Sequence, residues 1–193
     1  EAWEDYGIHY LTTAGSIDTY NLIVTDPIEA FDDLRGRKIG GVGSNMLFLK
    51  GSGSTGVTSD LIDWYNNMST GLLDGIIGWS EAVVAYKLYE VAPYILDIQF
   101  GGATSKAIVV NQRTWDRLPA EVQQVLHSTA EDYRDELARE TDRISARSRE
   151  EFVNQGGTII GVTAEQRLEW ASKLPDLTEA WVTAMEKKGL PGQ

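Results

Sequence analysis

Residues 34–45 read Leu-Arg-Gly-Arg-Lys-Ile-Gly-Gly-Val-Gly-Ser-Asn, and the stretch that they open, up to Gly75, decides the fold. A strand over residues 38–42 loses its side chains toward its end, and Ser44 and Asn45 then predict the start of a short helix. Residues 61–72 carry apolar side chains at helical spacing, and Gly75 opens a second strand. This alternation of strands and helices predicts an α/β fold with a mostly parallel sheet.

The same alternation continues on both sides of this stretch. Apolar residues at three- and four-residue spacing from Leu118-Pro119 to Phe152 predict one helix of more than about 30 residues, which is long for a globular protein. Further strands are predicted at residues 7–11, 21–24, 94–100, 106–111 and 158–160, and further helices at 28–34, 80–92, 163–174 and 176–188.

The composition excludes several classes of protein. The chain has 193 residues, a net charge of −12 and no cysteine. Nucleic-acid binders concentrate positive charge, so no nucleic-acid partner is expected. The lack of cysteine excludes disulfides, thiolate metal sites and a cysteine nucleophile. The first residues show neither a signal peptide nor an initiator methionine, so a processed chain or a fragment is expected, with the signal peptide in the parent protein.

No catalytic, nucleotide or metal motif stands in a suitable context. Gly51-x-Gly53-x-x-Gly56 matches the dinucleotide fingerprint, but it follows a predicted helix and precedes a strand, which is the reverse of what the fingerprint needs. The two histidines, His9 and His127, lack a nucleophile elbow and any metal-ligand spacing. We therefore expect no catalytic residue, no cofactor and no metal, although an α/β hydrolase or transferase with an unrecognised active site stays an alternative.

Trp79 is a candidate ligand-binding residue. It follows a short buried strand and precedes a predicted helix, at the end of a strand where open α/β sheets place their ligands. An aromatic side chain there offers a large contact area at low entropic cost. The alternative is that Trp79 packs in the core.

Four motifs, in this order, resemble those of the solute-binding proteins of tripartite ATP-independent periplasmic (TRAP) transporters. They are Asp32–Gly36, Thr70–Gly75, Tyr89–Ala92 and Asn111–Gln123. The resemblance implies a two-lobed α/β fold of the periplasmic-binding-protein type, with a long helix that spans both lobes. The family's mature chain is about half again as long, so the N-terminal part of the first lobe is expected to be missing.

The resemblance also assigns regions of the chain to the lobes. Residues 1–37 are expected to be the remainder of lobe 1 and a crossing strand, and residues 38–105 mainly lobe 2. Residues 106–193 are expected to hold the long helix and C-terminal elements that span both lobes.

Six residues are predicted to bind the ligand: Gly40, Ser44, Asn45, Leu61, Gly78 and Trp79. Many family members carry an arginine at the position of Gly40, where it clamps a ligand carboxylate. Glycine supplies no charge, so Ser44 and Asn45 at a helix start are the proposed substitute. Leu61 and Gly78 stand at the family's aromatic and polar positions. The pocket is therefore expected to be less polar than that of a sugar-acid or short-diacid binder.

The resemblance implies a periplasmic solute-binding protein without catalytic activity. It would capture a small organic acid, with an aromatic or bulky carboxylate favoured, and deliver it to the membrane subunits of a TRAP transporter. We expect a monomer.

Overall fold

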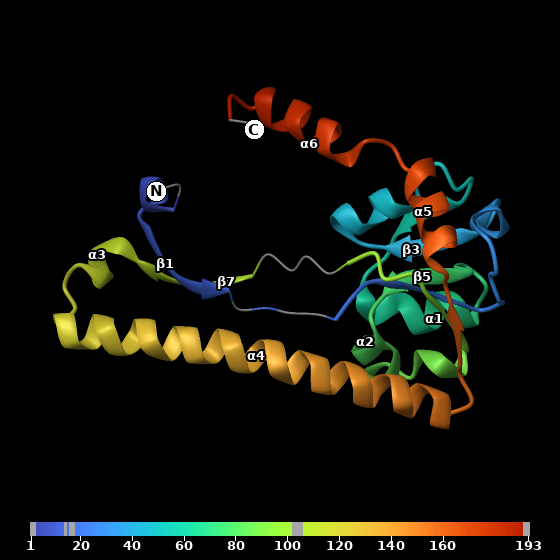
Figure 1. Ribbon diagram of the computed structural model, residues 1–193, viewed down its shortest axis with the longest axis horizontal. Coiled ribbons are helices and arrows are strands. Elements are labelled where there is room, and N and C mark those ends of the chain that lie inside the picture. Colours follow the sequence, from blue (N-terminus) through green and yellow to red (C-terminus); the bar gives the residue numbers. More distant parts are fainter. Residues whose placement is uncertain (1–2, 14, 16–17, 102–105, 191–193) are drawn as a thin grey trace. The chain divides into compact units, whose positions relative to one another are not determined.

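The computed structural model describes residues 3–13, 15, 18–101 and 106–190 (Figure 1). The chain forms two compact units, each made of two separate segments. Unit 1 comprises Glu1–Thr19 and Gly101–Arg147, and unit 2 comprises Tyr20–Phe100 and Ser148–Gln193.

Unit 2 is built on a six-stranded sheet in the order β4-β3-β5-β2-β6-β8. Its strands are β2 (Asn21–Val24), β3 (Lys38–Gly41), β4 (Thr55–Thr58), β5 (Gly75–Gly78), β6 (Tyr94–Asp97) and β8 (Thr158–Gly161). β2 pairs antiparallel with β5 and β6, while the other pairings are parallel. Five strands therefore run in one direction, which confirms the predicted α/β class with a mostly parallel sheet.

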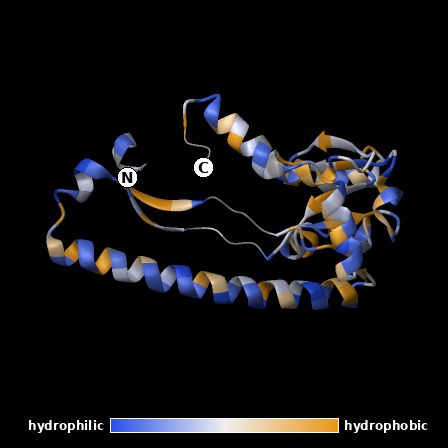
Figure 2. Ribbon diagram, turned by 45° about the horizontal axis from the view of Figure 1, so that its top comes forward, coloured by the Kyte–Doolittle hydropathy of each residue, from blue (hydrophilic) through white to orange (hydrophobic). Residues whose placement is uncertain are grey.

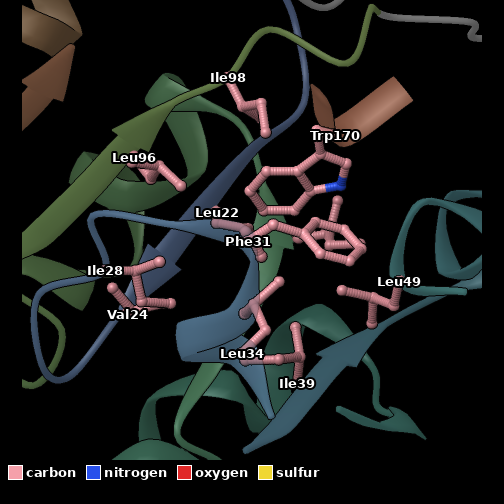
Figure 3. Packing of buried hydrophobic residues seen from close by; sticks show 11 residues of the cluster. Leu22, Val24, Ile28, Phe31, Leu34, Ile39, Leu49, Leu96, Ile98 and Trp170 are labelled. Carbon is pink, nitrogen blue, oxygen red and sulfur yellow. The ribbon is translucent and has the colours of Figure 1, made fainter. Parts of the chain in front are cut away.

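Alternate residues of each strand enter two separate cores, one on each face of the sheet. Leu22, Ile77 and Leu96 belong to the first cluster, and their neighbours Ile76 and Ile95 belong to the second. Figure 3 shows the first cluster, where Phe31 and Leu49 pack with Trp170 of helix α5 (Ala164–Lys173). The second cluster is covered by helices α1 (Trp64–Ser69) and α2 (Ser80–Ala85).

Five 3-10 helices and two further α-helices complete the described elements. The 3-10 helices are η1 (Glu4–Tyr6), η2 (Phe31–Leu34), η3 (Gly43–Leu49), η4 (Leu61–Asp63) and η5 (Leu88–Glu90). The further α-helices, besides the long helix α4 (Ala120–Asn154), are α3 (Gln112–Trp115) and α6 (Leu177–Glu186).

Unit 1 contains an antiparallel pair of strands, β1 (Ile8–Thr13) and β7 (Ala107–Asn111). The imidazole of His9 stacks on the Trp115 ring with centroids 3.8 Å apart, and the His127 ring meets both edge-on. His9 and His127 therefore take part in aromatic packing within this unit.

The longest element is α4 (Ala120–Asn154), which confirms the predicted helix of more than about 30 residues. It begins in unit 1 and ends in unit 2. Figure 2 shows hydrophilic and hydrophobic residues interspersed along it. In unit 1, the Ser145 hydroxyl donates to the Asp18 carboxylate at 2.7 Å. In unit 2, the Arg149 guanidinium makes two bonds to the Asp97 carboxylate, of 3.1 and 2.8 Å.

Three predicted local features are wrong. The helix from Ser80 ends at Ala85 rather than near Pro93, because Lys87 adopts a left-handed conformation with φ of 52°. The sequence predicts Ser80 as the N-cap of this helix, whereas the N-cap in the structure is Trp79. The short helix after β3 starts at Gly43 and its N-cap is Val42, so Ser44 and Asn45 lie inside the helix, where Oδ1 of Asn45 accepts from the Val42 backbone N–H.

The contact-based units divide the chain differently from the predicted regions. Residues 20–37, expected with lobe 1, lie in unit 2 because β2 occupies the middle of the six-stranded sheet. The assignment of regions 1–37, 38–105 and 106–193 to lobes stays a prediction.

Replacing Asp33 by Asn should reduce stability at neutral pH. The Asp33 carboxylate accepts bonds from the backbone N–H groups of Ala30 (2.9 Å) and Glu29 (3.0 Å). These bonds hold the pKa of Asp33 below its ordinary value. A lowered folded-state pKa contributes stability that is present above the unfolded value and is lost as pH falls through the folded value.

We expect the unfolding free energy of Asp33→Asn to be lower than that of the wild type at neutral pH. This difference should become smaller as pH falls below about 4. Urea titrations at several pH values measure it. Asp60→Asn is the control, because no side-chain hydrogen bond to its carboxylate occurs within the described part of the chain. A difference that stays constant with pH would contradict the prediction.

Candidate functional site

The carboxyl ends of the parallel strands form one edge of the unit 2 sheet. β3 ends at Gly41, β4 at Thr58 and β5 at Gly78, and antiparallel β2 starts at this edge with Asn21 opposite Gly78. Ligands of open α/β sheets bind outside this edge. The predicted site residues should therefore lie at or near this edge.

Gly40 is buried on the second face of the sheet. A Cβ added there would lie 2.6 Å from Cδ1 of Leu73 and 3.2 Å from Cγ2 of Ile76. The space that an arginine side chain would enter is thus occupied by apolar groups. The apolar packing around Gly40 therefore agrees with the lack of a charged side chain at this position.

Gly78 and Leu61 lie on the same face as Gly40. A Cβ on Gly78 would lie 2.7 Å from Ile23, 3.2 Å from Ile76 and 3.3 Å from the Trp64 ring. Leu61, at the start of η4, packs against the same cluster. The three positions therefore border one buried apolar cluster next to the sheet edge, and their ligand role stays a prediction.

Trp79 forms the aromatic part of this surface and is half-buried. Its ring meets the Trp64 ring edge-on at 6.0 Å and the Tyr20 ring edge-on at 6.2 Å. The Trp64 indole is fixed because its Nε1 donates to the Ser59 carbonyl at 3.0 Å. Trp79 therefore lies partly in the core and partly at the sheet edge. Its position is intermediate between the two predicted alternatives, a ligand-binding residue and a core residue.

Asn45 follows β3 on the opposite face from Gly40. It is buried, and its Oδ1 accepts from the Val42 backbone N–H at 3.0 Å. A Cβ on Gly41 would lie 3.3 Å from this oxygen, which places Asn45 on the first face. The side chain of Ser44 lies outside the described residues. The structure therefore separates Asn45 from Gly40, Leu61 and Gly78, and the ligand role of Ser44 and Asn45 stays a prediction.

Three residues at the same edge escaped the sequence analysis. Asn21 and Ser80 are almost fully buried, yet Nδ2 of Asn21 and Oγ of Ser80 have no hydrogen-bond partner among the described residues. Oδ1 of Asn21 is fixed by the Gln99 backbone N–H at 2.9 Å. Burial raises the pKa of the Tyr20 phenol, so this hydroxyl stays protonated at neutral pH. Asn21 reads as a strand residue in the sequence, and only its register with Gly78 reveals its place.

Within the described ranges, no group of three or more His, Cys, Asp or Glu residues could hold a metal ion. A separate search of the same ranges finds no helix with the length and apolarity needed to cross a bilayer.

The sequence profile of bacterial extracellular solute-binding proteins, family 7 (DctP), matches residues 1–184. The chain belongs to this family. The match confirms the resemblance read from the four sequence motifs, and it identifies a family of solute-binding proteins rather than the alternative of an α/β enzyme.

Solved structures of TRAP periplasmic solute-binding proteins share this fold. One from Desulfovibrio salexigens, in an open complex, has a TM-score of 0.80 and 20% identity over 97% of this chain and 58% of that chain. TeaA, the ectoine-binding protein of the TeaABC transporter, has a TM-score of 0.83 and 21% identity over 94% and 60%. Another from Desulfovibrio salexigens, with bound orotic acid, has a TM-score of 0.79 and 17% identity over 94% and 59%.

These likenesses confirm the fold. The present DctP chain spans less than two thirds of each of these relatives, which agrees with the expected fragment. The family consists of bacterial extracellular solute-binding proteins, which agrees with the predicted periplasmic location.

Proposed function

We propose that the protein containing this chain captures an aromatic or otherwise bulky organic acid and delivers it, as a monomer, to the membrane subunits of a TRAP transporter. The half-buried Trp79 at the sheet edge, with Gly40, Leu61 and Gly78 beside the same apolar cluster, carries this proposal. Closure of two lobes around the ligand would sequester it and present a docking surface to the transporter.

The apolar character of the surface supports a bulky ligand. Leu73 and Ile76 fill the space beside Gly40, and Ile23 and Trp64 border Gly78. Binding sites combine such walls with a few polar groups that fix the orientation of the ligand. The relative with bound orotic acid shows that a planar acid suits this fold in that protein.

Neutral donors supply a way to hold the carboxylate. Nδ2 of Asn21 and the Ser80 hydroxyl are buried without partners among the described residues, and a buried donor gains most from a ligand that accepts its bond. The proposal assigns both groups to the carboxylate, and the six predicted residues Gly40, Ser44, Asn45, Leu61, Gly78 and Trp79 stay candidates for the rest of the binding site.

A thermal-shift screen of the full-length protein against aromatic and aliphatic carboxylates tests the proposed ligand class. A ligand at 100 times its dissociation constant adds about 2.7 kcal/mol of stability. The expected result is a shift with aromatic acids and none with short diacids. Stabilisation by small aliphatic diacids alone would contradict the ligand class while leaving the binding function intact.

Replacing Trp79 by Ala should weaken binding of the aromatic acid about tenfold or more. An aromatic contact contributes about 0.5–1.5 kcal/mol beyond its buried area, and about 1.4 kcal/mol corresponds to tenfold in affinity. Titration calorimetry on the full-length protein measures the change. Trp181→Ala is the matched control, since Trp181 lies in α6 and is 54% exposed. Equal affinity of the wild type and Trp79→Ala would remove Trp79 from the site.

A further inference from the structure

A hollow lies on the first face of the unit 2 sheet, opposite the face that carries Gly40 and Gly78. Its volume is about 210 Å³. It is lined by Phe48, residues 98–100, Arg167, Trp170, Ala171 and Leu174. This volume is below the range of roughly 300–1,000 Å³ typical for drug-sized ligands, so the hollow suits a molecule with a single ring.

Three aromatic rings give the hollow fixed walls. The Phe48 and Phe100 rings stack at 4.6 Å with an angle of 11°, and the Phe100 ring meets the Trp170 ring edge-on at 5.5 Å. Nε1 of Trp170 donates to the Phe48 carbonyl at 3.4 Å. Trp170 lies beside Ile98 and Phe31 in Figure 3. Because buried Trp170 is held on several sides, a planar guest would meet walls that are already formed.

One face of α5 adds a positive charge to the rim. Four lining residues are spaced three or four apart, so their side chains lie on one side of α5 and at its C-terminal end. They are Arg167, Trp170, Ala171 and Leu174. The Arg167 guanidinium has no hydrogen bond or ion pair within the described part of the chain. The neighbouring Glu169 carboxylate is paired with Lys173 at 2.8 Å. The rim therefore offers an uncommitted cation next to an apolar, aromatic cavity.

We propose that this hollow is a second binding site, distinct from the candidate site at Gly40 and Gly78, for a single-ring aromatic carboxylate. The ring packs against Phe48, Phe100 and Trp170, and the carboxylate lies at the rim with Arg167, where guanidinium and carboxylate form paired hydrogen bonds. Charge complementarity selects an anion over a neutral aromatic molecule of the same shape.

Fluorine NMR of the full-length protein labelled with 5-fluorotryptophan tests the site, with benzoate as the probe and benzamide as its neutral isostere. Trp170→Phe assigns the Trp170 signal, and Trp79→Phe assigns that of the candidate site. Benzoate should shift the Trp170 signal in a saturable way, and benzamide should bind at least tenfold more weakly. Arg167→Gln should weaken benzoate at least tenfold, while the control Arg113→Gln, on exposed α3, should leave it unchanged.

Three outcomes would overturn the second site. They are a Trp170 signal that benzoate leaves in place, equal shifts with benzamide, and equal benzoate affinity in Arg167→Gln. A shift of the Trp79 signal alone would assign benzoate to the sheet edge and would leave the proposed function standing. A shift of the Trp170 signal alone would support the second site whatever the ligand of the sheet edge.

Discussion

Replacing Phe152 by Ala is expected to cost about 3–5 kcal/mol of the free energy of unfolding. Phe152 is fully buried in the second cluster of unit 2, in the last turn of α4. Its ring lies against Gly157, where an added Cβ would collide with it. Truncation removes the ring and leaves a cavity, because the backbone on both sides is fixed by the helix end and by β8. The loss is a large share of the roughly 5–15 kcal/mol that stabilises a typical protein.

Urea denaturation of the full-length protein measures this loss. The neighbouring Val153→Ala is the matched control, because Val153 is 52% exposed and its truncation should change stability by less than about 0.5 kcal/mol. A cost below about 1 kcal/mol for Phe152→Ala would mean that the end of α4 is not anchored to the sheet through this ring.

Restoring the family's arginine with Gly40→Arg should destabilise the protein by about 4 kcal/mol or more and should not create a carboxylate clamp. The new Cβ would lie 2.6 Å from Leu73, and the longer side chain would have to pass between Leu73 and Ile76. Overpacking alone costs about 1–3 kcal/mol, and a guanidinium left without a buried partner adds to that cost.

Two companion variants separate the causes. Gly40→Ala should show only the steric part of the loss in unfolding free energy. The double variant Gly40→Arg with Leu73→Ala should lose less unfolding free energy than the sum of the losses of the two single variants. Thermal and urea unfolding measure stability, and calorimetry measures carboxylate binding. A stable Gly40→Arg protein with tighter carboxylate binding would show that the site keeps room for the arginine.

Much of the fold follows from local patterns in the sequence. The spacing that ends at Phe152 predicts α4, and the alternation through residues 21–24 and 75–79 predicts strands that the structure contains. The antiparallel direction of β2 has no such signal, since it depends on which strands flank it. The early end of α2 depends on one left-handed lysine, Lys87, a conformation that any non-glycine residue adopts only under local constraint.

The candidate site was less predictable because it depends on pairs of residues that are distant in the chain. The family motifs identify Gly40, Leu61 and Gly78, and the structure brings these three to one face. Asn21 and Ser80 join them only through the register of β2 with β5 and the position of Trp79 as N-cap. The pattern of residues within each strand does not determine the register of β2 with β5.

The interleaving of the two units limits how this protein can be divided. β1 pairs with β7, which follows the first segment of unit 2 in the chain, and the unit 2 sheet is completed by β8, which follows α4. A nascent chain that has emerged only as far as residue 100 holds neither unit whole. Truncated expression products that stop there are therefore expected to expose unsatisfied strand edges and to aggregate, and no single backbone cut would release an intact half.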